Sequence, residues 1–193
     1  MKYYRETEFK ETEIGKIPKD WRVVKLGEVL NLKRGMRPKV LGIGSIPVYG
    51  AGGVIGYTNE YLVENDYIIV IGRVGTIDVY LTQGKIWVNE NAFYSESYDR
   101  SLVYLPFIYY LLKSKIKEIK RFAFGTAQLS IRITVIRDFP IPLPPLDEQK
   151  RIADVFLSVD EAIKQYYKQI DTFEEMKKTL NALLTGEIRL RKY

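Results

Sequence analysis

The sequence predicts an α+β fold, in which a mostly antiparallel-sheet region with one short helix precedes one long C-terminal coiled-coil helix. Two observations lead to this prediction. Up to about residue 105, short β-type runs alternate with turn residues, and beyond residue 150 apolar residues recur at spacings of four and three. A proline-rich segment separates the two patterns, so we expect one domain at 1–145 and the long helix with its tail at 146–193.

The sheet region follows a polar lead-in. Ile17 to Trp21 marks the start of ordered structure, and Arg22 to Leu26 is predicted to form a short strand. Turn-forming residues at 64–66, 72–75 and 82–84 separate the later apolar runs. We expect further strands at 46–49, 67–71, 76–81, 85–88 and 92–96.

A helix of about four turns is predicted after the sheet region. Pro106 suits its first position, because the N–H that proline lacks would have no partner there. The helix is expected to end near Gly125, and residues 125–130 read as an exposed polar loop. Residues 139–145 cannot be helical, because proline disfavours the helical conformation in the preceding residue, so they are predicted to be a stiff connector.

The C-terminal helix is predicted to run from about residue 147 to 185, with Asp147 as its N-cap and Gly186 as its stop. From Ile152 to Leu184 it would measure about 50 Å, against a diameter of about 40 Å for its domain. We therefore expect it to project and to pair with a second copy or another subunit. The alternative is that it folds back along the sheet. The expected interface residues are Ile152, Phe156, Val159, Ile163, Tyr166, Ile170, Phe173, Leu180 and Leu183.

The chain contains no cysteine and no histidine. This excludes disulfide scaffolds, thiolate or imidazole zinc sites, and nucleophiles served by a histidine base. The acids near the strands form no closely spaced metal-nuclease pattern, and Asn89-Glu90-Asn91 is not the signature of an amino-methyltransferase. We predict no catalytic residue, metal or cofactor. Short apolar runs and the lack of a signal-peptide core indicate a cytoplasmic protein without a membrane segment.

Positive charge is concentrated in two segments. Residues 31–45 carry four basic side chains and no acid, and residues 113–138 carry seven basic side chains against two acids. Such charge can belong to a solvated helix face and scattered loops. Because tyrosine, asparagine and glutamine are interleaved with it, we favour a nucleic-acid surface.

Four glycines lie within residues 48–57, V-Y-G-A-G-G-V-I-G-Y. A dinucleotide-binding loop needs a helix that starts within the glycine motif, and no helical pattern follows Gly56. No Gly-Lys-Ser/Thr follows either, so a phosphate-binding loop is also excluded. The segment is interpreted as a pair of tight turns, or as a loop in which absent side chains let the backbone approach DNA.

Four segments resemble the DNA-specificity (S) subunits of type I restriction-modification systems. They are 12–29 (T-E-I-G-K-I-P-K-D-W, then V-K-L-G-E-V), 46–57, 141–153 (I-P-L-P-P-L-D-E-Q-K-R-I-A) and 183–189 (L-L-T-G-E-I-R). The resemblance implies a non-catalytic, prokaryotic protein that selects DNA for methyltransferase (M) and restriction (R) subunits. A full S subunit has two recognition domains and two long helices, whereas this chain has one of each.

The resemblance therefore implies a half-subunit that dimerises through antiparallel helices and reads a two-part inverted repeat in double-stranded DNA. The alternatives are a homodimeric DNA-binding scaffold unrelated to restriction or, less favoured, a nuclease or methyltransferase. Arginine suits guanine edges, and asparagine and glutamine suit adenine edges. The candidates for base contacts are Asn59, Arg73, Asn89, Asn91 and Gln128, those for phosphates are Lys33, Arg34, Arg37, Lys39 and Arg132, and those for sugars or thymine methyls are Tyr57 and Tyr80.

Overall fold

The computed structural model describes residues 8–39 and 41–190 and confirms the predicted α+β class. The residues up to Ala153 form one compact unit, and those from Asp154 onward form a second. The outermost residues of the predicted lead-in and tail lie outside the described ranges. Among the described residues, no helix is both long and apolar enough to cross a bilayer.

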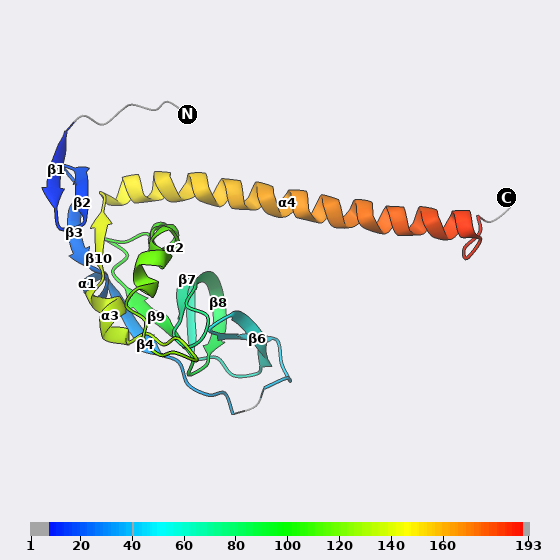
Figure 1. Cartoon of the computed structure of the whole chain (residues 1–193), viewed down its shortest axis with the longest axis horizontal. Coiled ribbons are helices and arrows are strands. Elements are labelled where there is room, and N and C mark those ends of the chain that lie inside the picture. The colour runs from blue at the N-terminus through cyan, green and yellow to red at the C-terminus, as the bar shows by residue number, and fades with distance from the viewer. Residues whose placement is uncertain (1–7, 40, 191–193) are drawn as a thin grey trace. The chain divides into compact units, whose positions relative to one another are not determined.

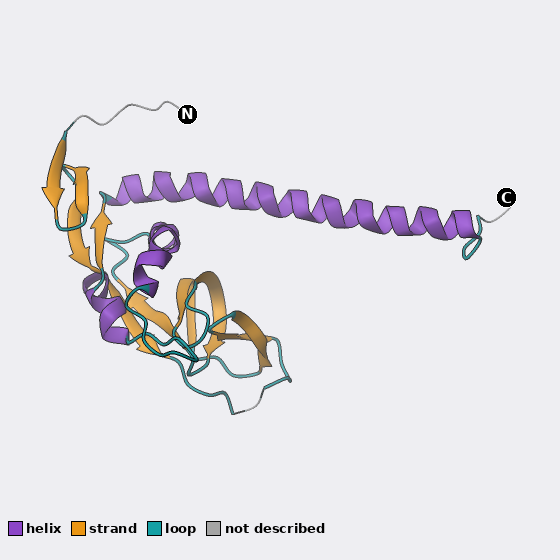
Figure 2. Ribbon diagram, in the orientation of Figure 1, coloured by secondary structure: helices purple, strands orange, loops and turns teal. Residues whose placement is uncertain are grey.

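A six-stranded sheet forms the centre of the first unit (Figures 1 and 2). Its order is β4-β9-β7-β8-β5-β6, and all neighbours are antiparallel except β5 and β8. The strands are β4 (Leu30–Arg34), β5 (Ile46–Gly50), β6 (Gly53–Thr58), β7 (Val63–Gly72), β8 (Val79–Val88) and β9 (Ala92–Tyr98).

Two predicted turns are wrong, because they lie inside β7 and β8. Residues 64–66 and 82–84 stay within these strands: Asn65 pairs with Gly84, and a register shift between Asn65 and Ile68 accommodates the polar residues. The predicted strands 76–81 and 85–88 are therefore one strand that begins only at Val79. A β-bulge disrupts a ladder locally without ending the strand, which turn-forming residue types alone do not reveal.

The central strand β7 is buried on both faces. Ile69 and Ile71 belong to a core that includes residues of α2 (Leu105–Lys120), whereas Ile68 and Val70 pack in a second cluster with Tyr94. This explains why Tyr67 to Gly72 is a continuous apolar run rather than an alternating one.

Helix α2 begins at Leu105, with Pro106 in its first turn, and ends at Lys120. The prediction that it starts at Pro106 and reaches Gly125 was therefore off by one residue at the start and by about one turn at the end. Two further helices were not predicted, because each has one turn or little more and offers almost no period to detect. They are α1 (Leu26–Val29) and α3 (Ile133–Asp138).

The predicted proline connector forms part of a small sheet. Strand β10 (Pro140–Leu143) pairs antiparallel with β3 (Arg22–Lys25), and it buries Ile141 and Leu143 in the core. Prolines at alternate positions are compatible with a strand that pairs on one side only. A second two-stranded sheet contains β1 (Phe9–Thr12) and β2 (Gly15–Pro18), which were also not predicted.

Helix α4 runs from Leu146 to Thr185, so Asp147 lies in the first turn instead of capping it. Gly186 has a φ of 79°, as expected of a glycine that ends a helix. Near the start of the helix, Gln149 is fully buried: its side chain accepts from the Tyr104 N–H and donates to the carbonyls of Leu102 and Pro144, each at 2.9 Å. Every residue from Ser158 to Asn181 is exposed.

Candidate nucleic-acid interface

The turn between β8 and β9, residues 89–91, is where several segments of the first unit meet. The Met36 N–H donates to the carbonyl of Val88, and the Asn89 N–H donates to that of Tyr49. On the other side, the Arg73 N–H donates to the carbonyl of Asn91. Backbone hydrogen bonds thus connect this turn to the ends of β5 and β7 and to the segment after β4.

Two arginine side chains converge on this turn, and we call them the arginine pair. Arg34 Nε and an Arg73 terminal nitrogen each donate to the backbone carbonyl of Glu90, both at 3.2 Å. Partial burial lowers the pKa of Arg73, and the positive charge of Arg34 lowers it further. Arginine remains charged at neutral pH in spite of this. Because a guanidinium carries five N–H donors, both side chains keep donors for an anion or a base edge.

The glycine segment 48–57 forms the hairpin of β5 and β6, whose turn is Ala51-Gly52. Gly50 faces Gly53, which has a φ of 104°. No helix follows β6, so the geometry is not that of a dinucleotide-binding loop, and there is one tight turn where two were expected.

The hairpin turn packs closely on the end of β7. A Cβ on Gly72 would lie 2.5 Å from the carbonyl oxygen of Ala51 and would also overlap that of Thr76. The Tyr80 hydroxyl donates to the Ala51 carbonyl at 3.4 Å. Tyr80 is half-buried, with its ring 6.5 Å from that of Tyr49 and the ammonium of Lys113 5.5 Å from its centroid. It thus holds the hairpin in place.

The loop from Phe124 to Ser130 joins the same surface. The Gly75 N–H donates to the Leu129 carbonyl, and the Ile131 N–H donates to that of Arg73. Gln128 is exposed, and its side-chain nitrogen would lie 3.4 Å from a Cβ on Gly75. Arg132 is also exposed, with its guanidinium 5.1 Å from the centroid of the Phe124 ring. The structure therefore places the loop that carries Gln128 against residues 73–75.

The two asparagines of the turn differ in accessibility. Asn89 is 9% exposed, and its side-chain oxygen accepts from the Asn91 N–H at 2.9 Å. Asn89 therefore stabilises the turn, and a base contact through it would require the turn to open. Asn91 is half-buried and lies beside the arginine pair.

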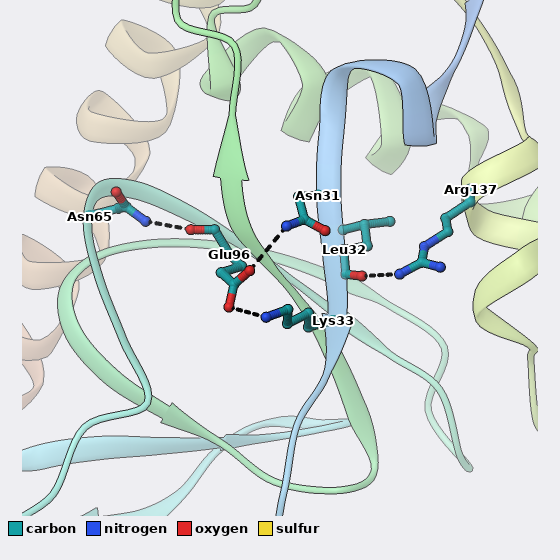
Figure 3. A network of polar contacts seen from close by, with 6 residues as sticks. All are labelled: Asn31, Leu32, Lys33, Asn65, Glu96 and Arg137. Atoms are coloured by element: carbon teal, nitrogen blue, oxygen red, sulfur yellow. Dashed lines mark hydrogen bonds and ion pairs between the residues drawn. The ribbon is translucent and has the colours of Figure 1, made fainter.

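Lys33 belongs to a separate polar network, which Figure 3 shows. Its ammonium pairs with the carboxylate of Glu96, which also accepts from Asn31 at 3.0 Å. The hydrogen bond that Lys33 donates to Glu96 raises the pKa of Lys33. Consecutive residues of a strand point to opposite faces, so Lys33 and Arg34 serve different surfaces. The charge of Lys33 is already balanced.

Four other candidates lie on the segment after β4, on β6 and directly after β6. The Gly42 N–H donates to the Tyr57 carbonyl at 2.9 Å, which brings the segment against the strand. Lys39 pairs with Glu60 at 3.7 Å, and both side chains are exposed. Arg37, Tyr57 and Asn59 are exposed as well. This group lies beside the β5–β6 hairpin.

The Glu90 carbonyl is the feature that sequence reasoning missed. A backbone oxygen that collects two guanidinium groups has no residue type to reveal it, and Arg34 was assigned from charge density alone. Among the described residues, no group of three or more acids could hold a metal ion.

The predicted helix interface divides into two parts. Ile152 packs against the core of the first unit, whereas most of the remaining residues expose about half or more of their surface. The exposed residues, with their exposed fractions, are Phe156 49%, Val159 49%, Ile163 45%, Tyr166 67%, Ile170 50%, Phe173 67% and Leu180 58%. Leu183 is intermediate. A contiguous apolar stripe of this size marks an interaction surface.

Comparison with known proteins identifies relatives that match almost the whole chain. The chain is 34% identical to the type I restriction enzyme MjaVIII specificity subunit of Methanocaldococcus jannaschii, over 95% of this chain and 50% of that protein. It is 27% identical to the EcoDI specificity subunit of Escherichia coli, over 89% of this chain and 38% of that one. The chain thus spans about half the length of the curated relatives it matches.

A solved structure has the same fold. The S subunit of a type I restriction-modification system from M. genitalium matches with a TM-score of 0.74 and 24% identity, over 85% of this chain and 45% of that chain. The type I restriction modification DNA specificity domain matches residues 18–172, which include the six-stranded sheet and about the first two thirds of α4. The resemblance noted in the sequence is confirmed, and the chain belongs to the type I restriction-modification DNA specificity family.

Proposed function

We propose that this chain binds double-stranded DNA through the first unit, on the surface around the arginine pair. The observation that carries this proposal is that Arg34 and Arg73 share the Glu90 carbonyl, in the turn that backbone hydrogen bonds connect to β5, β7 and the segment after β4. Two guanidinium groups held on one acceptor are preorganised, so little side-chain entropy remains to be lost when DNA binds.

The two arginines have different accessibility and therefore different proposed roles. Arg34 is exposed and suits a phosphate, where it would position the protein without reading sequence. Arg73 is half-buried beside Asn91 and near Gln128, and suits a guanine edge, which accepts two parallel hydrogen bonds from a guanidinium. Asn91 and Gln128 would read neighbouring adenines. Arg37, Lys39 and Arg132 would contribute phosphate contacts.

The apolar stripe of α4 supports a second proposal, that two copies pair through antiparallel long helices. Two identical recognition units at opposite ends of such a spacer would read an inverted repeat with an unread gap. At 1.5 Å per residue and 3.4 Å per base pair, a helix of about 50 Å bounds the separation near 15 base pairs. This proposal assigns a role to each part of the chain: residues 1–145 would be the recognition domain, and the helix from residue 146 would be the dimerisation helix.

The third part of the proposal is that the dimer docks M and R subunits and has no catalytic activity of its own. The relatives are named specificity subunits, which supports an adaptor between DNA and enzyme. Co-purification tests this part: the chain, expressed with the M subunit of its system, is expected to elute with it. A scaffold unrelated to restriction would elute alone. Turnover of DNA by the pure chain with Mg²⁺ or S-adenosylmethionine would contradict a non-catalytic role.

A further inference from the structure

Apolar residues in helix α4 follow a heptad repeat, and one charged residue occupies a position of the repeat that is otherwise apolar. Counting from Phe156 as position a, positions a and d are apolar along the exposed part of the helix except at Lys177. The a residues are Phe156, Ile163, Ile170, Lys177 and Leu184, and the d residues are Ile152, Val159, Tyr166, Phe173 and Leu180. A lone lysine at position a lowers coiled-coil stability but can specify register and strand orientation.

Lys177 disfavours a parallel pair. In a parallel dimer in register, each a residue faces its own copy, so two Lys177 ammonium groups would meet in one layer. Like charges in a partly desolvated layer repel strongly. In an antiparallel dimer a residues face d residues, and the two lysines lie in different layers.

One antiparallel register uses the whole exposed stripe. When Phe156 faces Leu180 of the partner subunit, Ile163 faces the partner's Phe173 and Tyr166 faces the partner's Ile170. Every exposed apolar a or d residue between 156 and 180 then meets another one, apart from Val159, which faces the partner's Lys177. A slip of one heptad in one direction places Phe156 opposite the partner's Glu187. A slip in the other direction places Leu180 opposite the partner's Gln149, a residue that is already buried in the first unit of its own chain.

The same register gives Lys177 a carboxylate. Position a lies on the side of the helix that also carries position e, and in this register the partner's Asp160, at position e, lies within about one residue rise, 1.5 Å, of Lys177 along the axis. Both residues are exposed in the single chain. A slip of one heptad would instead bring Lys177 level with Ala153 or Tyr167, neither of which carries a negative charge.

We propose that Lys177 of each chain pairs with Asp160 of the partner subunit, and that these two symmetric ion pairs fix the antiparallel register of the homodimer. This inference rests on the proposed dimer and adds a residue that determines specificity without touching DNA. A slip of one heptad moves the two recognition units by about 10 Å relative to each other, which corresponds to about three base pairs of gap.

Distance measurement between spin labels tests the register directly. Because the chain has no cysteine, Asp154→Cys provides one unique label site on the outer, exposed face of α4. In the proposed register the two labels are offset by 28 residues along the helix pair, which corresponds to about 42 Å along the axis. We expect one population near this distance, and Lys177→Leu is expected to add populations displaced by about 10 Å.

A single unchanged distance in Lys177→Leu would overturn the register role of Lys177, as would a main distance in the parent chain displaced by a heptad. The absence of any inter-chain distance would instead overturn the proposed dimer itself. Light scattering of the unlabelled chain separates these failures, because it reports the dimer without regard to its register.

A charge exchange tests the pairing of the two residues. Lys177→Glu and Asp160→Lys are each expected to weaken dimerisation at least tenfold, and the double variant is expected to recover to within about threefold of the parent. Lys178→Glu makes the same charge change one position away, on the outer face, and is expected to change little. Equal effects of Lys177→Glu and Lys178→Glu, or no recovery in the double variant, would overturn the ion pair. Circular dichroism checks that each variant keeps its helix.

Discussion

Arg34, at the end of β4, and Arg73, directly after β7, donate to the same backbone carbonyl, that of Glu90, at 3.2 Å each. Their charges repel, yet the shared acceptor holds them together. Partial burial, and then the positive charge of Arg34, lowers the pKa of Arg73. Such an arrangement stores unfavourable electrostatics that an anion would relieve, which is why this surface is the proposed DNA contact.

Replacement of Arg34 by glutamine should weaken DNA binding about equally for all sequences. A phosphate contact carries no sequence information, and its loss should reduce the slope of log affinity against log salt concentration by about one. Fluorescence anisotropy at several salt concentrations measures both quantities. Lys33→Gln is the matched control, because Lys33 is neutralised by Glu96, and an equal effect in that variant would contradict the assignment.

Replacement of Arg73 by glutamine should relax the preference at one base pair of each half-site. A lost bidentate guanine contact costs about 1–3 kcal/mol of discrimination. Binding selection from a randomised oligonucleotide pool reads out this change position by position. A loss of affinity that is uniform across sequences would show instead that Arg73 contacts the backbone.

Gly72→Ala should destabilise the first unit by about 1–3 kcal/mol, because its Cβ would overlap the carbonyls of Ala51 and Thr76 and push the hairpin away. Gly52→Ala, in the hairpin turn itself, is the control, since a Cβ there meets no atom within 4 Å. Urea denaturation at one protein concentration compares the two. Similar stabilities for both variants would show that the hairpin is not packed on β7.

Gln149→Ala should lower the free energy of unfolding by about 2–4 kcal/mol, since its fully buried amide makes three hydrogen bonds to backbone groups that would lose their partner. Its neighbour Lys150 is exposed, and Lys150→Ala should have little effect. The same denaturation assay distinguishes them. A small effect in Gln149→Ala would mean that water replaces the amide without cost.

The contribution of Asp78 to the free energy of unfolding should depend on pH. Burial acts to raise the pKa of Asp78, but the hydrogen bonds from Lys113 and from the Val79 N–H outweigh it, so the pKa lies below its ordinary value. A lowered pKa stabilises the fold above the unfolded-state value near 3.8, and this stabilisation is lost as the pH falls through the folded-state pKa. Between pH 5 and pH 3, the parent chain should therefore lose more stability than Asp78→Asn. Parallel pH profiles would contradict the ion pair.

The sequence predicts best those elements whose pattern repeats locally, and it predicts poorly those that depend on a distant partner. The long helix was predicted almost to the residue, because its heptad repeats over many turns and Gly186 ends it. The one-turn helix α1 and the proline strand β10 were missed, because their formation depends on tertiary partners such as the pairing of Pro140 with Lys25. Local propensity cannot include a partner that is more than a hundred residues away.

The candidate site shows the same limit. Arginine and glutamine could be proposed from their hydrogen-bonding chemistry, and the fold places the loop of Gln128 against residues 73–75, which include Arg73. The residue type of Asn89 suggested a base contact, but its side chain closes the turn instead. Whether an asparagine reads DNA or stabilises a turn depends on burial, which a single sequence does not reveal.

Sequencing of methylated bases in DNA modified by the assembled complex of this chain with its M subunit tests the central claim most directly. The proposed homodimer predicts methylation at one two-part inverted repeat with a gap of fixed length, and the same gap at every modified site. Methylation without a shared sequence would contradict the assignment of specificity to this chain, and an asymmetric site would show that a different recognition unit supplies the second half.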